Sequence, residues 1–213
     1  MDPAVIFEDD DLLVVDKPAG MVVHPAPGHE TGTLCQWALR HCPAMAGVGS
    51  ETRPGVVHRL DGGTSGVMVM AKTQRAYRRL RELFESHTAV EKTYLAVLHG
   101  APRPLAGTVD EPVGRERLGA VSHYRVLGRS GTLALVEFRI ETGRMHQIRQ
   151  HAKWLGHPVV GDDLYGDALA DRRHPRASER LLLHAVRLKF PHPVTGRAVV
   201  FDAPPPAELV YAR

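Results

Sequence analysis

The sequence predicts an α+β fold built on a mixed, mostly antiparallel central sheet that is flanked by helices and loops. Strand-like runs dominate the chain and mostly follow one another directly, whereas helical patterns are few. This order differs from the strict alternation of strands and helices that is typical of a parallel sheet. The 213 residues, 43% of them hydrophobic, can bury a sizeable core. We therefore expect residues 1–213 to form a single domain.

Short apolar runs bounded by Gly, Pro and Asp mark the predicted strands. These runs are residues 5–7, 12–15, 67–70, 93–98, 133–140 and 181–190. They are rich in Val, Leu and Ile, which favour the pleated surface of a sheet. Segments 99–120 and 161–180 are interpreted as loops. The second is strongly charged at 172–176, which indicates either a solvated surface loop or a contact to phosphates.

Three segments carry the apolar spacing of an amphipathic helix. The first, 33–41, is short. The second, 74–87, separates an apolar face from an arginine-rich face, and Thr73 is its expected N-cap. The third, 145–155, ends before Gly156, a common helix stop. Its predicted buried stripe is Met145, Ile148, Ala152 and Leu155.

Composition and targeting signals indicate a cytoplasmic protein. The net charge of +3 permits a polyanionic partner but does not demand one. Cys35 and Cys42 do not form a CxxC pair, so reduced thiols are expected. The first residues are acidic, unlike a signal peptide, and every apolar run is far shorter than the roughly 20 residues of a membrane span. We therefore expect no association with a membrane.

The most informative segment is 54–66, which contains Asp61. A short apolar strand is expected to lead into Asp61, and Gly62 and Gly63 follow it. Glycines give the backbone freedom and little steric cover, so a carboxylate here can be presented to a ligand. The common alternative is a turn aspartate that caps backbone amides. Spacing alone leaves both interpretations open.

Residue spacing argues against three other kinds of functional site. Ser65 is followed directly by Gly66, so the Gly-x-Ser-x-Gly turn of a serine hydrolase is missing. No Gly-Lys-Ser/Thr follows a glycine-rich run, which excludes a P-loop. His146 and His151 are about 140° apart around a helix, and neither HExxH nor paired CxxC occurs. We therefore predict that the protein has no metal site.

Arg149 and Tyr94 each allow two interpretations. Arg149 lies beside the buried stripe of the third helix, so its stem should be partly buried. A partly buried guanidinium needs a carboxylate partner, for which Asp61 is a candidate. A different carboxylate, or exposure of the head to solvent, is the alternative. Tyr94 shares a strand face with Ala96 and Leu98, which makes it either a core tyrosine or a platform for a stacked base.

Together these motifs resemble the RluA family of pseudouridine synthases. His58-Arg59-Leu60-Asp61 with Thr64-Ser65-Gly66 is similar to the family signature. The other similar blocks, in family order, are Asp16-Lys17-Pro18-Ala19-Gly20, Lys92-Thr93-Tyr94, Gly143-Arg144-Met145-His146-Gln147-Ile148-Arg149 with Gly156-His157-Pro158, Gly161-Asp162, Leu164-Tyr165-Gly166, and Leu182-Leu183-His184-Ala185. Two departures are Met145, where Thr or Ser is usual, and Gly62-Gly63, which replaces a more polar pair. The blocks cover nearly the whole chain, and we expect no S4-type RNA-binding domain.

The resemblance implies a pseudouridine synthase fold with an active-site cleft across the sheet, and a reaction that needs no cofactor and no metal. Asp61 would be the essential carboxylate, acting at the ribose C1′ or by another route. Tyr94 would stack on the uracil and is a candidate for proton transfer, while Arg149 would keep Asp61 ionised. Relatives insert the residue at Arg59 into the RNA stack when the target nucleotide flips out. The other residues assigned to RNA binding are His58, Thr64, Arg144 and His146.

The expected partner is a structured RNA, either a ribosomal or a transfer RNA stem-loop, and the expected state is a monomer. One alternative is an RNA-binding module of the same fold that does no chemistry. The combination of Asp61, Tyr94 and Arg149 argues against it, because a binder does not need all three. Another alternative is an unrelated metal-dependent hydrolase of nucleic acid.

Overall fold

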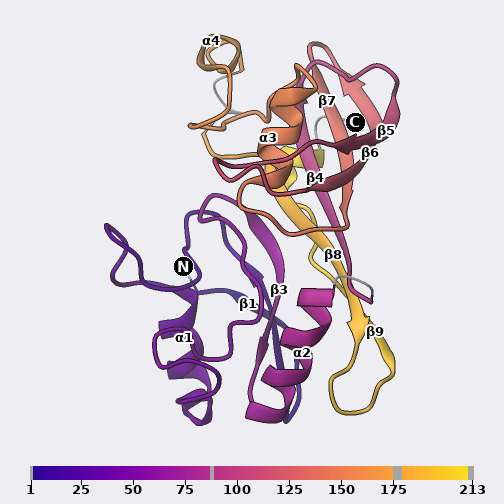
Figure 1. The fold of residues 1–213 in the computed structure, drawn as a ribbon. Coiled ribbons are helices and arrows are strands. Elements are labelled where there is room, and N and C mark those ends of the chain that lie inside the picture. Colours follow the sequence, from indigo (N-terminus) through magenta and orange to yellow (C-terminus); the bar gives the residue numbers. More distant parts are fainter. Residues whose placement is uncertain (1, 87–88, 175–178, 211–213) are drawn as a thin grey trace. The chain divides into compact units, whose positions relative to one another are not determined.

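The computed structural model describes residues 2–86, 89–174 and 179–210. It divides into two compact units (Figure 1). The first contains Met1–Glu91 and Arg187–Ala203, and the second contains Lys92–Val186 and Pro204–Arg213. That residues 1–213 act as one catalytic domain stays a prediction. His87, in the second predicted helix, and Pro175 and Arg176, in the charged segment, lie outside the described residues.

The first unit is built on antiparallel strands. These are β1 (Ala4–Glu8), β2 (Leu12–Lys17), β3 (Ser65–Ala71), the end of β8 (Leu183–Pro191) and β9 (Ala198–Asp202). β2 pairs with both β1 and β3, and β9 pairs with β8. Every residue of β3 is buried, which explains its unbroken apolar sequence. This strand is the rigid element that follows the Asp61 turn.

The α-helices α1 (Leu34–His41) and α2 (Gln74–Ser86) of the first unit lie where the sequence predicts helices. The short 3₁₀ helix η1 (Pro43–Met45) is not predicted. Thr33 forms a capping box with Gln36 at the start of α1. Thr73 caps α2, which lies against β3, by accepting a hydrogen bond from the Ala76 amide at 3.2 Å (Figure 1). Across the described ranges no helix is both long and apolar enough to cross a bilayer.

The second unit is also largely antiparallel. Its strands are β4 (Glu91–His99), β5 (Ala106–Asp110), β6 (Val121–Ser130), β7 (Leu133–Ile140) and the start of β8. Its helices are α3 (Gln147–Trp154), α4 (Ala168–Asp171) and α5 (Ala207–Val210). β7 pairs with β4 and β6, and β5 pairs with β6. The predicted α+β class with a mostly antiparallel sheet is confirmed.

Several predicted elements are wrong in detail. β5 and α4 lie inside segments 99–120 and 161–180, where the sequence predicts loops, and β6 and β9 are not predicted as strands. β5 has a single buried residue, Val109, and no apolar pattern, whereas β9 contains the apolar run 198–201, of which only Phe201 is buried. The expected strand before Asp61 is only an isolated bridge between Val56 and Met70. These segments are held by their neighbours rather than by their own apolar residues.

The third predicted helix starts later than expected. α3 begins at Gln147, and His146 before it adopts the left-handed conformation with φ of 55°. Met145 therefore precedes the helix and is 65% exposed, so its assignment to the buried stripe is wrong. Ile148 and Ala152 are buried as predicted, and Gly156, with φ of 77°, follows the helix end.

The two cysteines are free thiols, as predicted. Burial of Cys35 raises the pKa of its thiol to about 12, so it stays protonated and unreactive at neutral pH.

Candidate active site

Asp61 occupies a turn directly before β3. The amide of Thr64 donates to the carbonyl of Asp61 at 3.1 Å and closes this turn. Neither Gly62 nor Gly63 is among the glycines with a positive φ, so the turn does not use the left-handed region. A Cβ at Gly62 would lie 3.2 Å from Cγ1 of Val22, which is a tight contact. The backbone after Asp61 therefore packs closely against Val22.

The ammonium of Lys17 fixes the same turn from within the protein. Lys17 is fully buried, and its Nζ donates to the carbonyls of Pro18 at 2.9 Å, Met21 at 2.6 Å and Gly62 at 3.2 Å. A lysine has three N–H donors, so these bonds match its capacity. Because Gly62 directly follows Asp61, Lys17 anchors the backbone that carries the candidate carboxylate. Sequence reasoning placed Lys17 in a family block but gave it no role.

His58 and Thr64 have structural contacts within the first unit. Nε2 of His58 accepts a hydrogen bond from the Val69 amide at 3.1 Å, and its ring stacks on Phe84 with centroids 4.4 Å apart. Thr64 is buried. Arg59, by contrast, is exposed and accessible to a ligand. Contact of these three residues with RNA stays a prediction, and Arg59 is the best placed for it.

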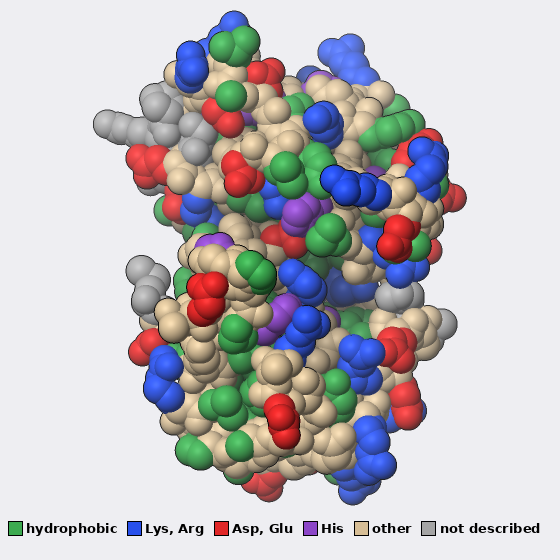
Figure 2. Space-filling view, turned by 60° about the vertical axis from the view of Figure 1, so that its left-hand side comes forward, with side chains coloured by type: hydrophobic (Ala, Val, Ile, Leu, Met, Phe, Trp, Pro, Cys, Tyr) green, Lys and Arg blue, Asp and Glu red, His purple; other side chains and the backbone are tan. Residues whose placement is uncertain are grey.

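Surface charge does not by itself identify an RNA-binding face. On α2, Arg79 pairs with Glu82 at 2.9 Å, and Arg81 pairs with Glu85. On the face drawn in Figure 2, Lys and Arg side chains lie among Asp and Glu side chains. Exposed pairs of this kind contribute little to stability and leave a small net field.

Tyr94 lies on β4 in the second unit, on the face opposite the main core cluster of that unit. Its cross-strand partner is Phe138, and it is 9% exposed. Leu95 and Val97, on the other face of β4, pack into that core cluster. Lys92 shares the face of Tyr94, because alternate residues of a strand point the same way. The role of Tyr94 as a stacking platform stays a prediction.

Lys92 is buried without a carboxylate partner among the described residues. It is 8% exposed, and its Nζ donates to the carbonyl of Thr142 at 3.4 Å, a long hydrogen bond. Burial lowers the pKa of its ammonium to about 8. Sequence reasoning missed this residue, because a lysine at a strand end is usually exposed. Its place in the Lys92-Thr93-Tyr94 block was the available signal.

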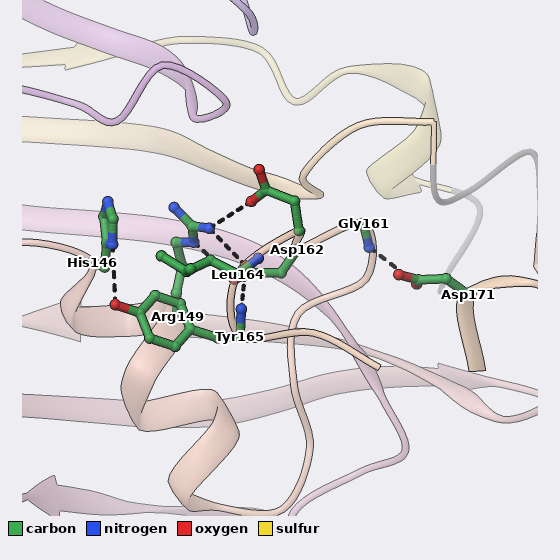
Figure 3. A network of polar contacts seen from close by, with 8 residues as sticks. His146, Arg149, Gly161, Asp162, Leu164, Tyr165 and Asp171 are labelled. Atoms are coloured by element: carbon green, nitrogen blue, oxygen red, sulfur yellow. Dashed lines mark hydrogen bonds and ion pairs between the residues drawn. The ribbon is translucent and has the colours of Figure 1, made fainter. Parts of the chain in front are cut away.

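Arg149 is held by two carboxylates (Figure 3). Its Nε and Nη2 donate to Asp162 at 2.7 and 2.6 Å, and Nη2 also donates to Asp163 at 3.0 Å. Arg149 and Asp162 are buried, whereas the Asp163 side chain is 95% exposed. The bidentate pair with Asp162 therefore provides the buried counter-charge. Asp61 belongs to the other unit, and its predicted pairing with Arg149 stays a prediction.

Asp162 organises the loop that follows α3. Its Oδ1 also accepts hydrogen bonds from the amides of Leu164 at 3.0 Å and Tyr165 at 2.9 Å (Figure 3). Desolvation, the largest single effect, would raise the pKa of Asp162. The hydrogen bonds from Arg149, Tyr165 and Leu164 outweigh it, so the pKa lies below its ordinary value. Asp162 is thus ionised at neutral pH and ties the loop to the helix.

Tyr165 links His146 to Arg149. The phenolic oxygen lies 3.2 Å from Nδ1 of His146, and Cζ of Arg149 lies 5.3 Å from the centre of the Tyr165 ring (Figure 3). The ring of His146, whose backbone is left-handed, thus contacts Tyr165. His146 is half-buried and Arg144 is exposed. The binding of RNA by these two residues stays a prediction.

Gln147 and His151 attach α3 to β6. Gln147 donates to the carbonyl of Val121 at 2.9 Å and to Oγ of Ser122 at 3.0 Å. His151 uses both ring nitrogens, toward Ser122 and the carbonyl of Glu111, each at 2.9 Å. Within the described residues no group of three His, Cys, Asp or Glu side chains is placed to hold a metal ion.

Gly161 allows a close backbone approach that positions Asp162. We expect Gly161→Ala to destabilise the protein by about 3 kcal/mol. Gly161 has a left-handed φ of 71°, and a Cβ there would lie only 2.0 Å from the Arg180 carbonyl oxygen. Gly156→Ala is the matched control, since its φ is 77° but its Cβ would meet no atom within 4 Å. It should cost only about 1 kcal/mol. Equal urea midpoints for the two variants would contradict the role of the close approach.

Comparisons with known proteins identify the same segments. The model of a family described as RNA pseudouridylate synthase matches residues 11–154, a range that contains Asp61, Tyr94 and Arg149. The chain is 42% identical to an uncharacterized RNA pseudouridine synthase of Synechocystis, over 98% of the chain and 68% of that relative. It is 40% identical to ribosomal large subunit pseudouridine synthase D of Zymomonas mobilis, over 96% of the chain and 70% of that relative.

A solved structure shares the fold. The structure titled human RNA pseudouridylate synthase domain containing 4 superposes with a TM-score of 0.77 at 27% sequence identity. The match covers 98% of this chain and 91% of the human chain.

Proposed function

The chain belongs to the RNA pseudouridylate synthase family, and we propose that Asp61 is the carboxylate with which it isomerises uridine to pseudouridine in RNA. The placement of Asp61 is the observation that carries this proposal. Asp61 lies in the turn that leads into the buried strand β3, directly before Gly62, whose carbonyl accepts a hydrogen bond from Lys17. A rigid support of this kind suits a carboxylate that must meet one atom of its substrate.

The reaction exchanges a carbon–nitrogen bond for a carbon–carbon bond. The bond from C1′ to N1 breaks, the uracil turns, and C5 bonds to C1′. The proton on C5 then leaves, and N1 gains a proton. In our proposal Asp61 acts at the ribose, by attack on C1′ or by another route. Tyr94 stacks on the uracil and takes part in the proton transfer, and Arg149 keeps Asp61 ionised.

The target nucleotide must leave the RNA stack before it can react. Extrusion of a nucleotide costs a few kcal/mol, and a protein side chain can fill the gap that remains. We assign this role to Arg59, because it is exposed and lies two residues before Asp61. A guanidinium can stack on bases and also bond to phosphate, so an arginine suits the task.

The relatives point to a ribosomal substrate. Several are named ribosomal large subunit pseudouridine synthase D, including those of Zymomonas mobilis and Pseudomonas aeruginosa. We therefore propose a stem-loop of large-subunit ribosomal RNA as the substrate, with transfer RNA as the second candidate. The proposed enzyme is a cytoplasmic monomer that needs no cofactor.

Release of tritium from RNA transcribed with 5-tritiated uridine tests this function, because C5 loses its hydrogen when it bonds to C1′. We expect the protein to release tritium from large-subunit ribosomal RNA, with EDTA present, and not from transfer RNA. Release from transfer RNA alone would overturn the ribosomal assignment. RNA binding without release from either would favour a module that binds but does not react.

A further inference from the structure

Isomerisation of uridine puts negative charge on the uracil ring. When the bond from C1′ to N1 breaks, its electron pair stays on N1 and spreads to the carbonyl oxygens O2 and O4. The uracil carries this negative charge whichever group is bonded to C1′ after the bond to N1 has broken. Inside a site from which water is excluded, such charge is best stabilised by a cation or hydrogen-bond donor that is already in place. The inference that follows rests on the proposed function, because it concerns this intermediate.

Lys92 is placed on the face of β4 where the uracil is proposed to stack. In the register of β4 and β7, Lys92 lies opposite Ile140 and Tyr94 lies opposite Phe138. Alternate residues of a strand share a face and are about 7 Å apart, so Lys92 and Tyr94 are neighbours on it. A uracil on the Tyr94 ring would therefore have its edge within reach of a lysine side chain.

The charge of Lys92 lacks the partners that the other buried cations have. Lys17 donates to three carbonyls, and Arg149 donates to two carboxylates. Among the described residues, Lys92 has one side-chain hydrogen bond, to Thr142 at 3.4 Å, and no ion pair. Burial of an ammonium with so few partners is costly. Negative charge on a bound substrate would offset this cost.

We propose that Lys92 is a further catalytic residue, whose ammonium contacts a carbonyl oxygen of the uracil and stabilises the negative charge that forms when the bond from C1′ to N1 breaks. The charge disappears from the ring when C5 bonds to C1′. The proton on C5 is then taken by the base and N1 is protonated. Lys92 keeps its own proton throughout, so it acts by charge and not by proton transfer.

The charge state of Lys92 gives the proposal a pH signature. Burial alone lowers the pKa of its ammonium, to about 8, and no charged group contributes. The groups that face it are the Thr142 carbonyl, the backbone of Gly143 and, on its own strand, the titratable Tyr94. At neutral pH Lys92 is mostly protonated. The active charged form is lost as the pH rises through about 8.

The test compares Lys92→Met, Lys92→Arg and the control Lys189→Met in the tritium-release assay. Lys189 pairs with Glu91 at 2.6 Å and is partly exposed, so its loss should leave the rate unchanged. Lys92→Met should lower kcat about 100-fold or more, and Lys92→Arg should restore part of it. The fall of kcat/KM near pH 8 should move to higher pH in Lys92→Arg, while any titration of the uridine itself stays in place.

Thermal stability separates this role from a structural one. An uncompensated buried charge destabilises the fold, so Lys92→Met should melt at the same or a higher temperature than the wild type at pH 7. A structural lysine would instead give a lower melting temperature. If the wild type releases tritium and Lys92→Met releases it with the same kcat, the role of Lys92 is overturned and the proposed function is not. Absence of release by the wild type would overturn the proposed function and this inference together.

Discussion

Replacement of Asp61 by asparagine is expected to abolish tritium release, with a loss of at least about 10⁴-fold in kcat, and to leave the protein folded. The amide has nearly the shape of the carboxylate but neither its charge nor its nucleophilicity. Asp61 is half-buried, and its turn is held by the Thr64 amide and by Lys17 through Gly62. Those contacts involve backbone atoms of the turn, so they survive the substitution.

This experiment needs a companion variant because the introduced asparagine would directly precede Gly62. An Asn-Gly bond deamidates readily and would regenerate a carboxylate, so Asp61→Ala is measured in parallel and the intact mass of Asp61→Asn is checked. Asp10→Asn, at an exposed position in the first unit, is the control and should keep full activity. Turnover by Asp61→Ala at the wild-type rate would rule out Asp61 as the essential carboxylate.

Arg149→Ala is expected to have the largest effect on stability, a loss of about 3–5 kcal/mol at pH 7. The substitution removes the bidentate partner of Asp162 and leaves a buried carboxylate without its counter-charge. Urea unfolding measures the loss. Asp163→Asn is the matched control, because its side chain is 95% exposed and its contact with Arg149 should contribute less than about 1 kcal/mol. Equal midpoints for Arg149→Ala and Asp163→Asn would contradict the assignment of Asp162 as the counter-charge.

The same variant should respond to pH in a defined direction. In the wild type the lowered pKa of Asp162 stabilises the fold above the unfolded pKa, about 3.9, and this contribution is lost as pH falls through the folded pKa. In Arg149→Ala, burial raises the pKa of Asp162, so acidification neutralises the uncompensated charge. The deficit relative to the wild type should therefore shrink between pH 7 and pH 5. A deficit that grows on acidification would show that Asp162 is not the cause.

Local patterns in the sequence were sufficient to predict several elements next to the candidate site residues. The apolar run of β3, the capping residue Thr73 and the glycine after α3 were each predicted correctly. Such features depend on neighbouring residues, so they can be recognised without knowledge of the fold. The family was also recognisable, because Asp61, Tyr94 and Arg149 stand in motifs at their expected order. The edge strand β5 was missed, since only Val109 gives it a buried residue.

Tertiary structure decided which charged groups meet. Lys17 reaches the carbonyl of Gly62, 45 residues away, and Arg149 finds Asp162, 13 residues away, rather than a partner on its own helix. Periodicity identifies the buried face of a helix or strand but not what lies opposite it. Met145 illustrates the limit, because the left-handed turn at His146 removes it from the helix and exposes it. The burial of Lys92 likewise depends on Thr142, which is 50 residues away in the sequence. Sequence therefore determined the family and elements with a strong local pattern, such as β3 and α2, whereas the partners and solvation of each charge followed from how distant segments pack.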